Sequence, residues 1–237
     1  MKALILNSGT GTRMGELTAD KCKCLVEIAN GKTILDEQMD RLIKCGITDF
    51  CITTGPFPNV LESYLRENYG DINFTFINNS LYNQTNYIYS IYLARDVLEG
   101  DILLLHGDLV FETSVIQDVL SSSQSVMVTD STKPLPLKDF KAELKGGKIL
   151  RVGVDVFENA LYAQPLYKLL KEDWAVWLGE ICRFCADGNT GVYAENALNC
   201  VSDKINLFQL DVQGRLCFEV DNIEDLTYAR SVYSKLL

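Results

Sequence analysis

The residues best suited to chemistry stand at the start of the chain, where glycines and cations follow a short apolar run, Leu4–Leu6. Glycines give the backbone freedom to fold closely around a ligand, and here they are Gly9, Gly11 and Gly15. Successive N–H groups of such a loop can form a concave site for an anion. Three cations follow within reach: Arg13, Lys21 and Lys23. The stretch therefore predicts a site for a phosphate chain such as the triphosphate of a nucleotide.

Two better-known phosphate loops do not fit this stretch. The dinucleotide fingerprint is G-x-G-x-x-G with an acidic residue about 20 positions later. Here the third glycine, Gly15, comes one place late, and basic residues follow it. The P-loop string G-x-x-x-x-G-K-[ST] does not occur. Without Arg13 and Lys23 the glycines would equally suit an ordinary turn between a strand and a helix.

A second group of candidate residues consists of carboxylates that follow predicted strands. Asp108 comes directly after the apolar run Ile102–Leu105 and a glycine, and ligands collect at the carboxyl ends of strands in open α/β sheets. Such a carboxylate is a natural Mg²⁺ ligand, although a turn aspartate is an equal alternative. Glu219 and Asp221 alternate with apolar residues, so they share one strand face and could complete a divalent-metal site with Asp108.

The beginning of the chain resembles the signature of the nucleotidyltransferases, L-A-A-G-x-G-[ST]-R, then L-T, then P-K-x-L. The matching segments are Leu6–Met14, Leu17-Thr18 and Lys21–Val26. The resemblance is specific because several residue types recur at fixed spacing. Two departures stand out: Asn7-Ser8 replaces Ala-Ala, and Cys22 replaces the proline before the lysine.

Three later segments resemble a narrower branch, the cytidylyltransferases that act on small amino-alcohol phosphates or phosphonates. They are Asn79–Ile91, Tyr193–Asn196 and Phe218–Asp225. In this branch the phosphocholine enzymes carry an aromatic residue where this chain has Ala194. Because a quaternary ammonium gains most from aromatic faces and a primary ammonium from hydrogen-bond acceptors, Ala194 favours 2-aminoethylphosphonate or phosphoethanolamine over phosphocholine.

The resemblance implies roles for individual residues. Lys23 and Arg13 would be the catalytic cations that hold the phosphates. Nucleotide-binding residues would be Asn7, Ser8, Gly9, Thr10, Gly11, Thr12, Tyr82 and Asn86. Asp108, Asp221 and Glu219 would bind Mg²⁺. Glu195 would face the acceptor's ammonium, with Tyr193, Trp174 and Lys141 as further acceptor-binding candidates, although tryptophans at helical spacing more often lie in a core.

The implied reaction is in-line attack by an acceptor oxygen on the α-phosphorus of CTP, with pyrophosphate as the leaving group. The attacking oxygen is already anionic at neutral pH, so positioning and charge neutralisation suffice. His106, the only histidine, is therefore interpreted as structural rather than as a general base.

Composition fits one α/β domain. The chain has 237 residues, 47% of them hydrophobic, which is enough for a core. The alternation of strands and helices, together with the family resemblance, implies a Rossmann-like mixed, mostly parallel sheet flanked by helices, with a small β-hairpin insertion. We expect a nucleotide-binding half (1–130) and an acceptor-binding half (131–237).

The net charge of −10 disfavours a nucleic-acid partner. We expect no membrane span or secretory signal and a cytoplasmic location with reduced thiols, and the chain could form a homodimer. A zinc site from Cys22, Cys24, Cys182 and Cys185 is disfavoured, since turn residues do not flank the pairs.

The elements that must position these residues alternate between strand and helix. Predicted strands cover residues 50–52, 71–77, 102–105 and 125–128, and predicted helices cover 34–45, 85–98 and a segment from Pro58. A hairpin is expected over 133–151, a helix from about Leu166 to Ala186, and a terminal helix after Asp225.

Three alternatives to the cytidylyltransferase interpretation remain. The chain could transfer a nucleotide to a sugar 1-phosphate, or it could be a catalytically silent relative that binds a nucleotide for regulation. A dinucleotide-binding oxidoreductase is disfavoured by the glycine spacing.

Overall fold

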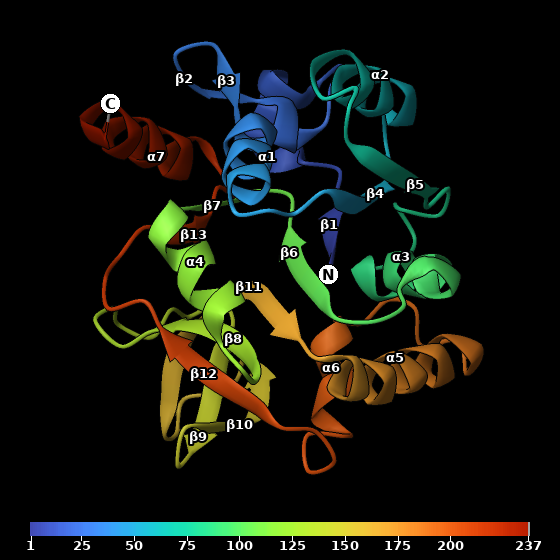
Figure 1. Cartoon of the computed structure of the whole chain (residues 1–237), viewed down its shortest axis with the longest axis vertical. Helices are drawn as coiled ribbons and strands as arrows, with labels where there is room; N and C mark the ends of the chain where they lie inside the picture. Colours follow the sequence, from blue (N-terminus) through green and yellow to red (C-terminus); the bar gives the residue numbers. More distant parts are fainter. Residues whose placement is uncertain (237) are drawn as a thin grey trace.

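A nine-stranded mixed sheet organises the molecule, with helices on both of its faces (Figure 1). The computed structural model describes residues 1–236. The strand order is β5-β4-β1-β6-β11-β8-β12-β10-β9, with an additional pairing between β9 and β11. The predicted fold class, a mixed sheet flanked by helices, is confirmed. Within the described residues no helix is long and apolar enough to cross a membrane.

The first half of the sheet is parallel. Its strands are β1 (Lys2–Asn7), β4 (Asp49–Thr54), β5 (Asn73–Asn78) and β6 (Ile102–His106). The helices that connect them are α1 (Ile34–Lys44), α2 (Pro58–Asn68) and α3 (Tyr87–Ala94). Parallel neighbours need such crossover connections, and they bring the carboxyl ends of β1 and β6 side by side.

The second half of the sheet is more antiparallel than predicted. Its strands are β8 (Ser125–Asp130), β9 (Lys141–Lys145), β10 (Lys148–Gly153), β11 (Ala160–Leu169) and β12 (Leu207–Asp211). β11 runs antiparallel to both β6 and β8, and only β8 and β12 form a parallel pair among these five strands. The expected hairpin is confirmed as β9 and β10, which Gly146-Gly147 connects.

Smaller elements complete the described chain. Two short antiparallel pairs are β2 (Glu27–Ala29) with β3 (Lys32–Thr33) and β7 (Leu109–Phe111) with β13 (Cys217–Glu219). The remaining helices are α4 (Thr113–Ser121), α5 (Lys171–Ala186), α6 (Ala194–Asn199) and α7 (Ile223–Leu236), with 3₁₀ turns at Thr12–Thr18, Lys23–Leu25 and Arg95–Val97.

Two hydrophobic cores lie on opposite faces of the sheet, because successive side chains of a strand point to opposite sides. Along β1, Ala3 and Ile5 pack into one core, with residues of α1, α2 and α4. Leu4 and Leu6 pack into the other core, with residues of α3, α5 and α6. This double burial makes β1 a fixed support for the loop that follows it.

The predicted helix from about Leu166 is wrong over its first turn. Leu166 to Leu169 belong to β11, and Leu166 pairs with Leu105 of β6; α5 begins only at Lys171. A short apolar run fully buried in a sheet cannot be distinguished from a buried helical segment by periodicity alone. The predicted helix over 85–98 is also shorter, because Asn86 caps it and Arg95–Val97 is a 3₁₀ turn.

Asp36 anchors the start of α1 and gives a prediction for stability. Thr33 and Asp36 form a reciprocal capping box, and the Asp36 carboxylate accepts hydrogen bonds from the hydroxyls of Tyr64 at 2.6 Å and Tyr69 at 2.9 Å. Burial raises the pKa of this carboxyl, but these hydrogen bonds outweigh it and hold the pKa below its usual value. We expect Asp36→Ala to lower the free energy of unfolding by about 2 kcal/mol.

Urea unfolding of wild type and Asp36→Ala across pH checks this expectation. Because the folded pKa is depressed, the ionised carboxylate stabilises the fold above its ordinary pKa of about 3.9, and the advantage is lost as the pH falls through the folded value. The difference in the free energy of unfolding between wild type and variant should therefore be largest at pH 7 and shrink below about pH 4. An equal difference at pH 7 and pH 3 would contradict this account.

Candidate active site

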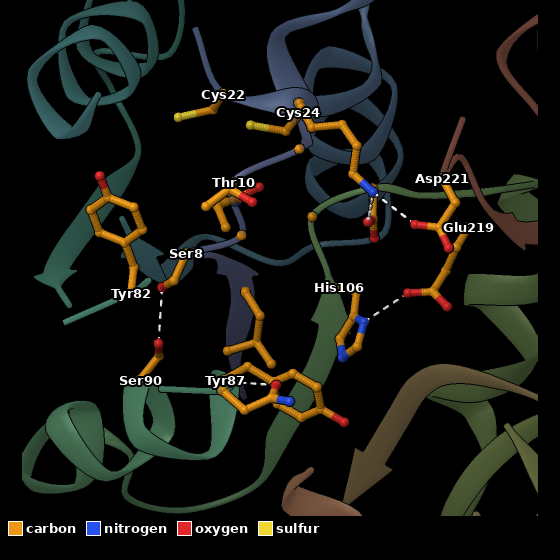
Figure 2. A pocket seen from close by; sticks show the side chains of 18 of the residues that line it. Ser8, Thr10, Cys22, Cys24, Tyr82, Tyr87, Ser90, His106, Glu219 and Asp221 are labelled. Carbon is orange, nitrogen blue, oxygen red and sulfur yellow. Dashed lines mark hydrogen bonds and ion pairs between the residues drawn. The ribbon is translucent and has the colours of Figure 1, made fainter. Parts of the chain in front are cut away.

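A cavity of about 530 Å³ opens at the carboxyl ends of β1 and β6, where the two halves of the sheet meet. Most of the residues predicted for the site line it: Asn7, Ser8, Gly9, Thr10, Gly11, Thr12, Arg13, Lys23, Tyr82, Asn86, Asp108, Tyr193, Glu219 and Asp221. The position at strand ends is the one expected for an α/β sheet. Figure 2 shows several of these side chains converging on the same space.

Close backbone approach explains two of the glycines. Gly11 has a φ of 64°, and a Cβ there would lie 3.1 Å from the Cβ of Lys23. Gly107, before Asp108, lies so near Asn7 that a Cβ would come within 1.7 Å of the Asn7 side-chain oxygen. Residues with side chains cannot occupy such positions without displacing their neighbours, so these glycines hold the loop against Lys23 and β6 against Asn7.

A buried hydroxyl network supports the loop from the side of α3. The Ser8 hydroxyl donates to Thr53 at 3.0 Å and accepts from Ser90 at 3.0 Å (Figure 2). The Asn79 amide in turn donates to Ser90 at 3.0 Å. The network therefore couples the start of the glycine loop to the segment that carries Tyr82.

Lys23 lies between two carboxylates. Its ammonium forms ion pairs with Asp108 and, at 2.9 Å, with Asp221. Arg13 reaches the same Asp221 oxygen at 2.9 Å. Burial lowers the pKa of Lys23, but the two carboxylates outweigh it and raise the pKa above its ordinary value, so Lys23 is charged at neutral pH. The cluster places two cations next to the glycine loop, where they could engage a phosphate chain, and the two carboxylates balance their charge.

His106, which was predicted to be structural, also lines the cavity. His106 Nδ1 lies 2.7 Å from the Glu219 carboxylate (Figure 2), and its Nε2 is buried without a hydrogen-bond partner among the described residues. Burial lowers the pKa of His106, but Glu219 outweighs it and raises the pKa to about 9. The missed signal was the position of His106 at the carboxyl end of β6, where ligands collect in α/β sheets.

The carboxylates form a donor set for a cation. His106, Asp108 and Glu219 each offer one ligand atom, and these atoms lie within 4.8 Å of one another. One oxygen of Asp108 is buried without a hydrogen-bond partner in the described part of the chain. A buried oxygen without a partner destabilises the fold, and a bound cation would give it a partner. Asp221 lines the same cavity, where Lys23 and Arg13 engage it. Carboxylate oxygens suit Mg²⁺.

Glu195 lies behind the cavity wall rather than in it. The residue is 1% exposed, and its carboxylate accepts hydrogen bonds from the hydroxyls of Tyr87 and, at 2.7 Å, of Tyr167. Tyr87 itself lines the cavity, where its ring lies 6.0 Å from that of Tyr193. The expectation of direct contact between Glu195 and a substrate is therefore corrected: its carboxylate binds the hydroxyl of Tyr87, which lines the cavity.

Two acceptor-binding candidates were predicted wrongly. Trp174 is a core residue, 2% exposed, whose indole donates to the Leu98 carbonyl, as expected for a helix whose apolar stripe faces the sheet. Lys141 is fully buried, and its ammonium donates to the carbonyls of Pro136 and Val154. Lys138, Asp139 and Phe140, the residues just before β9, line the cavity instead.

The chain is similar to proteins of a known family. Residues 2–134 match the family model described as "Nucleotidyl transferase". The chain belongs to this family. The predicted family resemblance is thus confirmed, and the glycine loop and Lys23 both lie within the matched part of this nucleotidyltransferase.

Several curated relatives are cytidylyltransferases. The CTP:phosphoglutamine cytidylyltransferase of Campylobacter jejuni is 31% identical over 160 residues, which cover 64% of this chain and 62% of the relative. The choline-phosphate cytidylyltransferase of Streptococcus pneumoniae is 26% identical over 95% of both chains. A third relative, the CMP-5'-(3-aminopropyl)phosphonate synthase of Streptomyces rubellomurinus, is 28% identical over 58% of this chain but only 22% of its own length. The matches to the first and third relatives thus span less than two thirds of those proteins.

Solved structures confirm the fold. The CTP:phosphocholine cytidylyltransferase from Streptococcus pneumoniae superposes with a TM-score of 0.76 at 21% identity, over 98% of both chains. The inositol-1-phosphate CTP transferase from T. maritima superposes with a TM-score of 0.80 at 20% identity, over 99% of this chain and 95% of that one.

Proposed function

We propose that this nucleotidyltransferase is a Mg²⁺-dependent cytidylyltransferase. It would transfer CMP from CTP to a small phosphate or phosphonate that carries an amino group, namely 2-aminoethylphosphonate, phosphoethanolamine or phosphocholine. The observation that carries the proposal is the cluster of Lys23, Arg13, Asp108 and Asp221 beside the glycine loop in one cavity. The cytidylyltransferases among its relatives support CTP as the nucleotide.

The cavity residues suit phosphoryl transfer without a protein nucleophile. An acceptor oxygen attacks the α-phosphorus of CTP, and pyrophosphate leaves from the opposite side. Lys23 and Arg13 neutralise the charge of the triphosphate, and the N–H groups of Gly9 to Gly11 add fixed dipoles. Pre-organised cations of this kind lower the barrier because they need no reorganisation during the reaction.

Mg²⁺ is proposed as the cofactor. Asp108, Glu219 and Asp221 would hold it, and the unpartnered buried oxygen of Asp108 fits that role. When bound, the ion would neutralise charge on the phosphate oxygens of the nucleotide. In the structure Lys23 supplies the countercharge to two of these carboxylates.

The two halves of the chain would bind different substrates. Residues 1–130 supply the glycine loop, Lys23 and Asp108, and we propose them as the nucleotide-binding half. Residues 131–237 supply Tyr193 and Phe140, whose rings lie 5.1 Å apart in an edge-to-face contact, and we propose them as the acceptor-binding half. The predicted homodimer and cytoplasmic location stay predictions.

Glu195 would act on the acceptor through Tyr87. A buried carboxylate beneath an aromatic wall makes that wall more attractive to an ammonium group. We expect Glu195→Gln to raise KM for the amino-bearing acceptor about 10-fold, equivalent to ~1.4 kcal/mol of binding, with little change in KM for CTP. Steady-state kinetics with each substrate varied in turn check this. Equal changes in both KM values would point to a general loss of structure, and Tyr167→Phe, which removes one partner of the carboxylate, serves as the comparison.

Pyrophosphate release tests the proposed function. The purified chain with Mg²⁺ is incubated with each of the four nucleoside triphosphates and with phosphocholine, phosphoethanolamine, 2-aminoethylphosphonate, glucose 1-phosphate or inositol 1-phosphate. Release with CTP and an amino-bearing acceptor is the expected result. Release with a sugar or inositol phosphate alone would favour the second candidate, a sugar-1-phosphate-type nucleotidyltransferase, which the whole-chain similarity to an inositol-1-phosphate CTP transferase supports. If no pair released pyrophosphate, both candidate functions would be overturned.

A further inference from the structure

Two cysteines flank Lys23 in the wall of the cavity. Cys22 and Cys24 both line it, with exposed fractions of 3% and 1%, and Figure 2 draws both sulfur atoms among the lining side chains. We propose that these two thiols are a modification site at which a hydroperoxide converts the pair into an intramolecular disulfide. The inference goes beyond the proposed function, because its main measurement does not depend on which acceptor or nucleotide the enzyme uses.

The local backbone brings the two thiols together. Cys22 immediately precedes the 3₁₀ turn Lys23–Leu25, and the Leu25 N–H donates to the Cys22 carbonyl at 2.9 Å. The two sulfur atoms point into the same part of the cavity (Figure 2), and the Cys22 thiol donates to the Pro56 carbonyl at 3.2 Å. Residues two apart have Cα atoms at most ~7.3 Å apart, and a folded turn shortens this toward the ~4.4–6.8 Å that disulfides span.

The two thiols differ in acidity in the way a reactive pair requires. The neighbouring Cys24 side chain lowers the pKa of Cys22 and outweighs burial, which raises it. Burial and the neighbouring Cys22 raise the pKa of Cys24. The thiolate is the nucleophile, so Cys22 would attack and Cys24 would resolve. By contrast, burial raises the pKa of Cys51 to about 12, which makes it an unreactive reference thiol.

The chemistry balances in two steps. The Cys22 thiolate attacks one oxygen of the hydroperoxide, the O–O bond breaks, and the other oxygen leaves and takes up a proton as an alcohol or water. Cys22 is then a sulfenic acid. The Cys24 sulfur attacks the Cys22 sulfur, the S–O bond breaks, and the oxygen leaves as water with the proton of Cys24. The two thiols lose two electrons and two protons in total, and the hydroperoxide gains them.

Ring closure around Lys23 would alter the nucleotide site. Lys23 stands between the two cysteines, and its ammonium is held by Asp108 and Asp221. A disulfide across its peptide bonds would change the backbone angles that aim this ammonium. We expect the oxidised chain to bind CTP at least ~10-fold more weakly than the reduced chain, as measured by isothermal titration, and a dithiol reductant to restore the affinity.

The test measures the disulfide directly. The full chain with the exposed Cys200 replaced, Cys200→Ser, is treated with hydrogen peroxide, quenched, alkylated and mapped by peptide mass spectrometry. A peptide joining Cys22 to Cys24, lighter by two hydrogens and restored by dithiothreitol, is the expected result, with Cys51 still free. In Cys24→Ser a sulfenic acid on Cys22 should instead be trapped by dimedone. Two free thiols at positions 22 and 24 after peroxide treatment, or pairing with other cysteines, would overturn the inference.

Nucleotide protection places the reaction in the cavity. CTP at ~10 times its Kd should slow disulfide formation ~10-fold, because only the unliganded fraction reacts. The same experiment with the other three nucleoside triphosphates separates the two proposals. Protection by a nucleotide other than CTP would contradict CTP as substrate but support the thiol site, whereas no protection by any of the four would overturn the location of the site.

Discussion

Replacing Lys23 by alanine should lower turnover by about 10³-fold, because one pre-organised donor to transition-state charge is worth roughly that much. The Lys23 side chain is only 14% exposed, and its ammonium forms ion pairs with Asp108 and Asp221 beside the glycine loop. Since the proposed contact is with the phosphates of CTP rather than with the acceptor, the loss should be the same for every acceptor. Single-turnover rates with CTP at saturation measure it without interference from binding.

Lys21 provides the matched control for this experiment. It lies two residues away and carries the same charge, but it does not line the cavity. Lys21→Ala should stay within about threefold of wild type, because the substitution removes no side chain from the cavity. Far-UV circular dichroism and the melting temperature show whether Lys23→Ala still folds. A folded Lys23→Ala chain with near-normal turnover would remove Lys23 from the proposed mechanism.

The second large effect concerns Asp108 and the metal. Asp108→Asn keeps the shape of the side chain but removes the charge that would hold Mg²⁺ and that pairs with Lys23. We expect activity to fall by about 10³-fold at millimolar Mg²⁺ and the half-saturating Mg²⁺ concentration to rise, since a hard cation depends on anionic oxygen ligands. Chelation of the metal should abolish wild-type activity, and added Mg²⁺ should restore it.

Asp96→Asn is the control for Asp108→Asn. The Asp96 side chain is 80% exposed, so its loss removes the same charge from the chain without touching the cavity. A titration of activity against Mg²⁺ for wild type and both variants gives the comparison. If Asp108→Asn required no more Mg²⁺ than wild type, Asp108 would not be a ligand.

Residues that follow strands were the ones that the sequence could place. Asp108 lines the cavity as predicted because it follows the buried strand β6, and Glu219 and Asp221 do so because they alternate with apolar residues. Lys23 also lines it as predicted, but its position came from the family motif rather than from a strand end. Trp174 and Lys141 could not be placed in this way. Lys141 is the first residue of β9, and the residue before it, Phe140, lines the cavity. Which side chains of a strand face a site depends on its pairing with other strands.

Long-range contacts explain the other differences. Glu195 accepts hydrogen bonds from Tyr87 and Tyr167, which lie 108 and 28 residues away, and no local pattern predicts that pairing. β11 was mistaken for helix at Leu166 because its pairing with β6 and β8 joins segments that lie far apart in the sequence. Tertiary context of this kind overrides both propensity and periodicity.

The ion pair between Lys23 and Asp221 joins residues that are 198 positions apart, and the pairing of β13 with β7 brings Asp221 to Lys23. During synthesis the ribosome adds residues at about 5–20 per second, so the glycine loop emerges well before Asp221 exists. A nascent chain that ends before β13 lacks two of the three proposed metal ligands, and we expect it to be inactive. Catalytic competence would therefore require synthesis at least as far as Asp221, long after the glycine loop has left the ribosome.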